Sequence, residues 1–209
     1  FQNIKKFIIY LLSCNLSEIF IVAITGFIDI SLTLLPLQIL FINLVTDVFP
    51  ALALGMGKES PLIMKYPPRD PASPVIDSKD WRKIVLYASV MTAVVTIACF
   101  YCYYSLNLGA EICNNVIFFS LAFSQIFHVL NMYSGNATFI KNEITQNIYV
   151  WAAIIISSFI LIVIEFIEPL VKVLSLVPMN KEVWMIIFIA AVSPVIIIQI
   201  LKKIFYPKN

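Results

Sequence analysis

Residues 36–55 read PLQILFINLVTDVFPALALG, an almost unbroken apolar run in which Asp47 is the only charged residue. A helix needs about 20 mainly apolar residues to cross a bilayer, and this segment has that length. Backbone N–H and C=O groups in hydrocarbon must be paired within their own segment, so such a run forms a helix rather than a lone strand. The segment therefore predicts a membrane-spanning helix with a polar group near its middle.

The rest of the chain follows the same pattern. Hydrophobic residues make up 61% of the 209 residues and charged residues 12%, whereas soluble domains are about 45–50% apolar. This excess predicts an all-α membrane protein, a six-helix bundle whose main surroundings are the lipid bilayer. The net charge of +2 gives no sign of a nucleic-acid partner. We expect one transmembrane domain, residues 1–209, with helices over about 5–27, 34–55, 82–104, 113–134, 148–170 and 183–204.

Lysine and arginine are distributed unequally between the two sides of this bundle. If the chain crosses the bilayer at each predicted helix, only Lys172 and Lys181 fall on one side. The other twelve basic residues fall on the opposite side, near the two chain ends and in or beside the loops. Loops on the cytoplasmic side carry the excess of positive charge. We therefore expect both termini to be cytoplasmic, together with the proline-rich loop 56–81.

Polar residues inside the first two predicted helices are the main functional signal. Asn15 and Glu18 share one helix face, and Asn43, Thr46 and Asp47 share a face of the next helix. Ionisable groups within a membrane usually face the bundle interior or a water-filled site. Carboxylate, amide and hydroxyl oxygens suit a hard cation such as Ca²⁺. We expect these five residues to form a cation site.

Two other interpretations of the same residues stay open. In the first, the polar residues only form hydrogen bonds between the helices. In the second, the two carboxylates, Glu18 and Asp47, form a proton relay. Pro50 has no N–H to donate to the carbonyl of Thr46, so we expect the helix to be unwound or kinked there, with carbonyls turned toward an ion.

The fourth predicted helix adds a weaker polar stripe. Gln125, His128 and Asn131 are spaced by three residues, and Gln125 would lend one more oxygen to the site. We interpret His128 as a packed core residue. Three cysteines at the end of the third helix and the start of the fourth are interpreted as small apolar residues, with a disulfide between the second and third left open: Cys99, Cys102 and Cys113.

The same segments resemble a known family. The Asn-Leu-Val-Thr-Asp core at 43–47 and the Pro-Ala-x-Ala-Leu-Gly at 50–55 resemble the sixth membrane helix of P-type cation-transporting ATPases, in particular the calcium-pump branch. Residues 15–18, Asn-Leu-Ser-Glu, resemble the Asn-x-x-Glu of the family's fifth helix, and Pro-Pro-Arg-Asp-Pro at 67–71 resembles the loop after the sixth. The similarity, strong over residues 1–75, covers the last six of ten membrane helices.

The resemblance implies roles for single residues. Asn15, Glu18, Asn43, Thr46 and Asp47 would coordinate the transported ion. Gln125 stands where two-calcium pumps have a glutamate, so the number of ions carried is open. The resemblance implies Ca²⁺ as the cargo, while Na⁺, Mn²⁺ or H⁺ remain alternatives.

The resemblance also implies that other parts of the pump lie outside this chain. The sequence has no Asp-Lys-Thr-Gly motif, so we expect no ATP hydrolysis by these residues alone, and ATP and Mg²⁺ would bind elsewhere. The expected partners are the preceding membrane helices and the phosphorylation, nucleotide-binding and actuator domains of a parent P-type ion-translocating ATPase, with loop 56–81 as a docking surface. We expect a multi-pass protein of the cell membrane. The alternative is a self-standing six-helix channel, carrier or regulatory protein.

Overall fold

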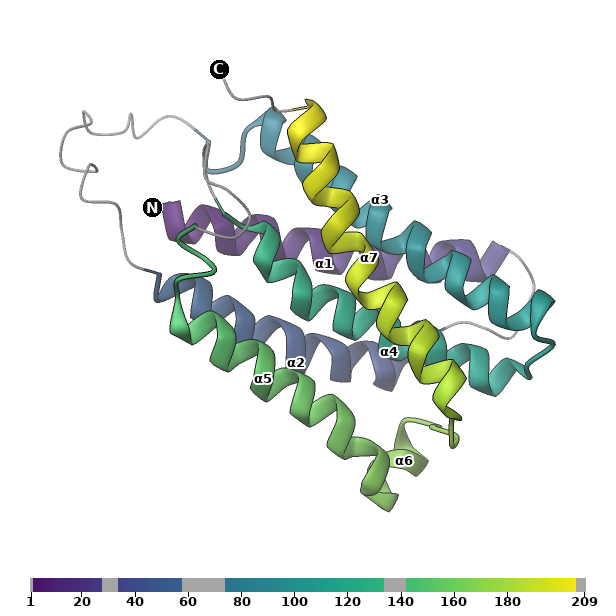
Figure 1. Cartoon of the computed structure of the whole chain (residues 1–209). Coiled ribbons are helices and arrows are strands. Elements are labelled where there is room, and N and C mark those ends of the chain that lie inside the picture. Colours follow the sequence, from purple (N-terminus) through teal and green to yellow (C-terminus); the bar gives the residue numbers. More distant parts are fainter. Residues whose placement is uncertain (1, 28–33, 58–73, 134–141, 206–209) are drawn as a thin grey trace, which may run out of the picture.

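The computed structural model describes residues 2–27, 34–57, 74–133 and 142–205, and every regular element in these ranges is a helix (Figure 1). Six of the described helices are long and apolar enough to cross a membrane, which confirms the predicted all-α class. The helices are α1 (Gln2–Phe27), α2 (Pro36–Gly55), α3 (Ser78–Phe100), α4 (Ala110–His128), α5 (Ile148–Val163), α6 (Glu168–Val173) and α7 (Lys181–Phe205). Short turns extend three of them: a π-helical turn at Tyr101–Ser105 and 3-10 turns at Val129–Asn131 and Ile164–Phe166.

The main difference from the predicted boundaries lies at 148–170, which is not one helix. α5 ends at Val163, and α6 begins after Ile167, whose backbone is extended. Pro169 lies in the first turn of α6, where its missing N–H costs nothing, but it could not continue α5. A proline in this place therefore separates two helices and turns the chain.

Helix starts follow the capping side chains of the sequence. Asp77 accepts hydrogen bonds from the backbone N–H of Lys79 (2.8 Å) and of Asp80 (2.9 Å), so α3 starts at Ser78, before the predicted 82. Asn147 caps α5 by accepting from Tyr149 N–H at 3.0 Å. Such caps satisfy amides that have no partner within the helix. Of the predicted loop 56–81, residues 58–73 lie outside the described residues.

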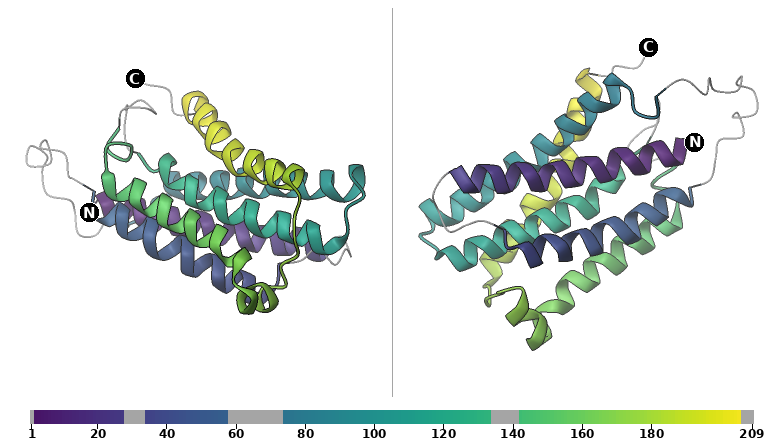
Figure 2. Two further views of the ribbon diagram at one scale, coloured as in Figure 1. Left: turned by 60° about the horizontal axis from the view of Figure 1, so that its bottom comes forward. Right: turned by 180° about the vertical axis from the view of Figure 1, so that it is seen from behind.

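α4 occupies the centre of the bundle. It packs against α7, α3, α5, α2 and α1, while α1 packs on α3 and α2 (Figures 1 and 2). Almost every α4 side chain from Cys113 onward is buried. A polar side chain on α4 therefore has to find its partners among the surrounding helices.

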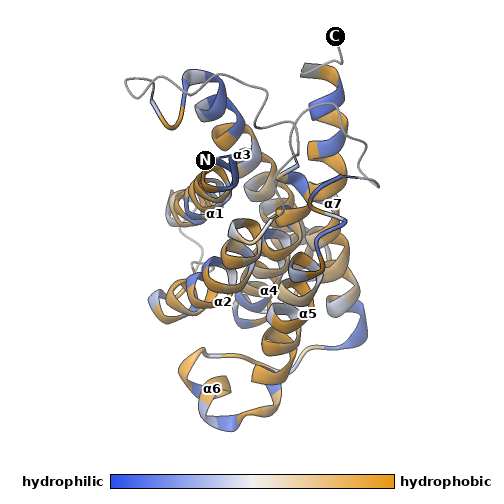
Figure 3. Cartoon of the chain, turned by 90° about the vertical axis from the view of Figure 1, so that its left-hand side faces the viewer, coloured by the Kyte–Doolittle hydropathy of each residue, from blue (hydrophilic) through white to orange (hydrophobic). Residues whose placement is uncertain are grey.

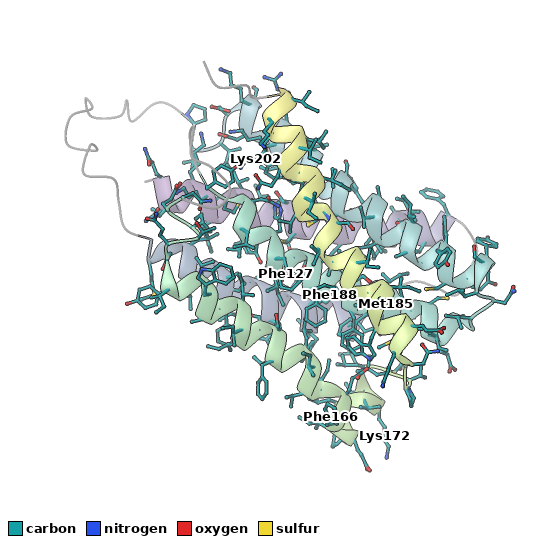
Figure 4. All side chains as sticks on the ribbon, in the orientation of Figure 1. Phe127, Phe166, Lys172, Met185, Phe188 and Lys202 are labelled. Atoms are coloured by element: carbon teal, nitrogen blue, oxygen red, sulfur yellow. The ribbon has the colours of Figure 1, made fainter. Side chains whose placement is uncertain are left out.

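The outer surface of the bundle is apolar. Large side chains remain exposed on the described helices, including Phe166 (79% exposed), Phe188 (63%) and Met185 (60%) (Figure 4). Figure 3 shows hydrophobic ribbon along the lengths of the helices and hydrophilic stretches mostly toward their ends. Such a surface would be unstable in water and matches lipid. The chain is a multi-pass membrane protein.

Charged contacts join several segments at one end of the bundle. Lys5 in the first turns of α1 lies 2.5 Å from the carboxylate of Asp80 at the start of α3. Lys6 pairs at 2.8 Å with Glu143, just before α5. Lys172 lies in the last turn of α6, at the opposite end (Figure 4). These ion pairs hold the start of α1 against the start of α3 and against the segment just before α5.

The cysteines are core residues. Cys14, Cys99, Cys102 and Cys113 are all described, buried and free, so no disulfide joins Cys102 to Cys113. No group of three or more His, Cys, Asp or Glu side chains in the described ranges is arranged to hold a metal. The interpretation of these thiols as small apolar residues agrees with their burial.

Candidate cation site

The polar faces of α1 and α2 meet inside the bundle. Glu18 on α1 is only 5% exposed although it lies in a spanning helix. One end of the Asn43 amide, from α2, lies 2.9 Å and 3.2 Å from the two carboxylate oxygens of Glu18 and 3.3 Å from Oδ1 of Asn15. Three of the predicted residues are thus in direct contact, as helical spacing on two antiparallel neighbours predicted.

The direction of the Asn43 amide determines what this contact means. With its nitrogen toward Glu18, the amide donates to the carboxylate and to Asn15. With its oxygen toward Glu18, four oxygens from three side chains converge, and they repel each other unless a cation lies among them. The two ends of an amide are assigned from their surroundings. A 180° turn of the Asn43 side-chain amide therefore converts a self-bonded cluster into a set of cation ligands.

Gln125 brings the central helix into the cluster. Its amide nitrogen lies 3.0 Å from Oε1 of Glu18, 3.1 Å from the carbonyl oxygen of Cys14 and 3.3 Å from Oγ of Ser17. Its Oε1 is buried and has no hydrogen-bond partner in the described part of the chain. A buried acceptor without a partner costs free energy, and a cation is one way to satisfy it.

Thr46 and Asp47 lie one turn farther along α2. The Thr46 side chain is fully buried and its hydroxyl donates to Oδ1 of Asp47 at 3.4 Å. Asp47 is half-buried. The structure therefore brings Asn15, Glu18, Asn43 and Gln125 into one contact group, with Thr46 and Asp47 next to it.

The predicted unwinding at Pro50 is wrong, because α2 continues without interruption from Pro36 to Gly55. The carbonyl of Thr46, which Pro50 cannot serve, accepts a hydrogen bond from the hydroxyl of Tyr10 at 3.2 Å. The preceding carbonyl of α2, that of Val45, also accepts a hydrogen bond from another helix, because the hydroxyl of Ser157 on α5 donates to it at 3.2 Å. Donors from two other helices thus satisfy α2 where it carries the polar residues.

Tyr10 is a site residue that the sequence reasoning missed. Its hydroxyl is shared between the carbonyl oxygens of Thr46 on α2 and Gln125 on α4, the latter at 3.1 Å, and the residue is fully buried. The sequence signal was weak, because Tyr10 lies in the N-terminal third of α1, about one turn after Lys5 and Lys6, where a tyrosine could equally belong to the membrane interface. Once its ring is buried, the tyrosine hydroxyl needs a hydrogen-bond partner inside the bundle.

His128 lies beside the cluster and is a packed residue. Its ring stacks on Tyr10 with centroids 6.1 Å apart and meets Tyr87 edge-on at 5.1 Å. This placement agrees with its interpretation as a core side chain.

Comparison with known proteins identifies the family of the chain. The chain matches the family described as "Cation transporting ATPase, C-terminus" over residues 31–204. The chain belongs to this family. The matched range of this cation-transporting ATPase C-terminal domain contains Asn43, Thr46, Asp47 and Gln125, and it begins after Asn15 and Glu18.

Individual relatives extend the comparison to the cluster on α1. This C-terminal domain is 33% identical over 189 residues to "Calcium-transporting ATPase" of Bacillus subtilis (strain 168), covering 90% of the chain and 21% of the relative. It is 25% identical to "Calcium-transporting ATPase 1" of Bacillus cereus, covering 97% and 24%. It is 26% identical to "Calcium-transporting ATPase 3, endoplasmic reticulum-type" of Arabidopsis thaliana, covering 97% and 23%. The chain spans between a fifth and a quarter of the length of these relatives.

Proposed function

We propose that the chain is the membrane-embedded transport module of an ATP-driven pump, with calcium as its cargo. The observation that carries this proposal is the convergence of Glu18 and Asn15 on the Asn43 amide, one end of which lies within 3.3 Å of both side chains inside a lipid-exposed bundle. A carboxylate is costly at such a depth unless it serves an ion or a proton. The relatives' names, which identify calcium-transporting ATPases, support calcium as the ion.

The cargo would be held by oxygens from three helices. Glu18 and Asp47 supply negative charge, and the amide oxygens of Asn15 and Asn43 supply neutral ligands, as does Oε1 of Gln125. Thr46 adds its hydroxyl and the open lone pair of its carbonyl. Counted once each, these groups are about seven oxygens, within the about 6–8 that calcium takes, and they include no thiol or imidazole. Part of the shell would come from outside this chain.

Binding would exchange one set of contacts for another. Before the cation arrives, the amide nitrogens of Asn43 and Gln125 donate to the carboxylate of Glu18. When a cation enters, the Asn43 amide turns and presents its oxygen. Since Glu18, Asn43 and Gln125 belong to α1, α2 and α4, this exchange alters how three helices are held together. Alternating access needs such a difference between the occupied and empty states.

The distribution of basic residues supports an orientation for this module. Of the described lysines and arginines, seven lie at the end where α1 begins and α7 ends, and Lys172 and Lys181 lie at the other end. We assign the basic end, with both termini and loop 56–81, to the cytoplasm of a cell membrane. The phosphorylation, nucleotide-binding and actuator domains of the parent pump would then lie on the side of loop 56–81.

The test uses the full-length pump that contains these residues. Purified pump is phosphorylated from ATP at graded calcium concentrations, and wild type is compared with Asp47→Asn. We expect the variant to need at least tenfold more calcium for half-maximal phosphorylation, because the site loses one of its two charges. The matched control is Asp77→Asn, which changes an exposed aspartate outside the spanning helices.

An unchanged calcium dependence in Asp47→Asn would refute the assignment of the site. Phosphorylation that responds to Mn²⁺ or Na⁺ but not to calcium, in wild type, would keep the pump and change its cargo.

A further inference from the structure

A second polar network lies at the end of α4, next to the cation site but separate from it. The side chain of Gln199 on α7 donates to Oδ1 of Asn131, and its own oxygen accepts from the hydroxyl of Tyr133 at 2.6 Å. These residues are buried or half-buried in a bundle whose surface faces lipid. The network joins the last turns of α7 to the point where α4 ends.

Lys202 is the charged member of this network. Its ammonium donates to the carbonyl oxygen of Asn131 at 2.8 Å and lies 3.5 Å from that of Tyr133. It also lies 3.7 Å from the centroid of the Tyr133 ring, within reach of a cation–π interaction. The last carbonyls of a helix have no donor within the helix and carry partial negative charge. Lys202 therefore acts as a cap, supplied by α7, on the C-terminal end of α4.

The neighbouring lysine shows that this position is specific. Lys203, the next residue, is exposed. Figure 4 places Lys202 near the C-terminal end of α7, the end at which α4 finishes. Holding a long charged side chain half-buried between two helices costs conformational entropy and hydration. The hydrogen bonds of Lys202 offset this cost and fix the position of the end of α4.

Contacts connect this cap to the cation site. Asn131 lies 3.2 Å from Nδ1 of His128, and the His128 ring stacks on Tyr10 with an angle of 18° between the planes. Tyr10 in turn donates to the carbonyl oxygens of Thr46 and Gln125. Side chains in a close-packed interior have few alternative positions. A shift at the end of α4 would therefore move the His128 ring, the Tyr10 hydroxyl and the Thr46 carbonyl.

We propose that Lys202 is a positioning residue for the cation site, holding the end of α4 so that His128 and Tyr10 set the carbonyl of Thr46 and the place of Gln125. The inference rests on the proposed function, since it assumes that a cation binds at Glu18 and Asp47. It gives α7, which carries none of the expected ligands, a part in cation affinity.

A double-mutant cycle in the full-length pump tests this coupling. Lys202→Met keeps the length of the side chain and removes its charge, and Tyr10→Phe keeps the ring and removes its hydroxyl. The readouts are the calcium concentration for half-maximal phosphorylation from ATP and the maximal level of phosphorylation. Lys203→Met is the matched control, and Lys202→Arg keeps the charge.

We expect Lys202→Met to raise the half-maximal calcium concentration about three- to tenfold with an unchanged maximal level, a coupling of the usual size. Lys202→Arg should recover most of the affinity, and Lys203→Met should match wild type. In the double variant, the increase in the half-maximal calcium concentration should be at least about threefold smaller than the product of the two single increases, because both changes release the same carbonyl.

Three results would overturn the inference: effects that multiply in the double variant, a Lys202→Met variant equal to Lys203→Met, or a loss of maximal phosphorylation with unchanged calcium dependence. The last would indicate a purely structural role. Asp47→Asn separates this failure from that of the proposed function. If Asp47→Asn shifts the calcium dependence and Lys202→Met does not, the site stands and only the positioning role fails.

Discussion

Replacing Pro50 with alanine should make α2 more stable and bind its cation less tightly. A carbonyl oxygen has two lone pairs. Tyr10 occupies one lone pair of the Thr46 carbonyl, and Pro50 leaves the other without a helical donor. In Pro50→Ala the new backbone N–H of residue 50 would bond to this carbonyl, which would then have no lone pair for a cation.

The two magnitudes follow from the structure. Removing a proline from a helix interior gains about 3 kcal/mol, and losing two ring carbons of a buried residue costs about 1.6 kcal/mol. The net gain of about 1 kcal/mol would raise the unfolding temperature of the membrane domain. A cation would have to break the new hydrogen bond, which costs about 0.5–1.5 kcal/mol. The calcium affinity should therefore fall roughly 2- to 12-fold.

The assay measures both properties in the purified full-length pump, by thermal unfolding and by the calcium dependence of phosphorylation. Pro194→Ala is the comparison variant, because Pro194 is also a buried proline inside a helix, α7, and the carbonyl it leaves open belongs to Ala190 and not to an expected ligand. It should raise stability and change the calcium dependence less than Pro50→Ala does. An unchanged or higher calcium affinity in Pro50→Ala would refute the reasoning that the Thr46 carbonyl is kept open for the ion.

Two further predictions concern the end of the bundle where α1 meets α3. Asp80→Asn breaks the pairs of a buried carboxylate with Lys5 at 2.5 Å and Lys83 at 3.4 Å, so it should cost about 1.5–3 kcal/mol and lower the unfolding temperature by roughly 3–12 °C; no change would mean that these pairs contribute nothing. Hydrogen bonds from the backbone N–H of Asp80 first, then the charge of Lys5, hold the pKa of Asp77 below its ordinary value. Its contribution to stability is therefore complete above the unfolded pKa of about 3.9 and is lost as the pH falls through the folded pKa. Asp77→Ala should accordingly lower the unfolding temperature at neutral pH, and a difference that does not diminish as the pH falls below about 3.9 would contradict this.

The contact among Asn15, Glu18 and Asn43 could be predicted because it depends on two short-range rules. Helical spacing puts Asn15 and Glu18 on one face, and a short connection makes consecutive helices antiparallel neighbours. Depth in the bilayer then follows from counting residues. No knowledge of the other helices was needed.

The contacts of Gln125 and Tyr10 could not be predicted in the same way. Gln125 meets Glu18 across 107 residues of chain, and Tyr10 meets Gln125 across 115. Which helices touch, and in which rotation, is decided by packing around α4, and hydropathy does not record it. The error at Pro50 has the same origin. A proline frees a carbonyl, but whether the helix unwinds depends on donors elsewhere, here Tyr10 and Ser157.

The cluster has enough internal donors to remain folded without a cation. Glu18 receives hydrogen bonds from the amides of Asn43 and Gln125, so an empty site does not leave a bare charge inside the bundle. A cation must displace these bonds, and this moderates its affinity, because each bond to a charged group is worth about 1.5–3 kcal/mol. A transporter has to release its cargo as well as bind it. Amide side chains allow both, because they donate to the carboxylate in the empty state and accept from the cation in the occupied state. Additional acidic residues around Glu18 would also make a cation site, but they could not donate hydrogen bonds to Glu18 when the site is empty. This difference explains why asparagine and glutamine surround the carboxylate.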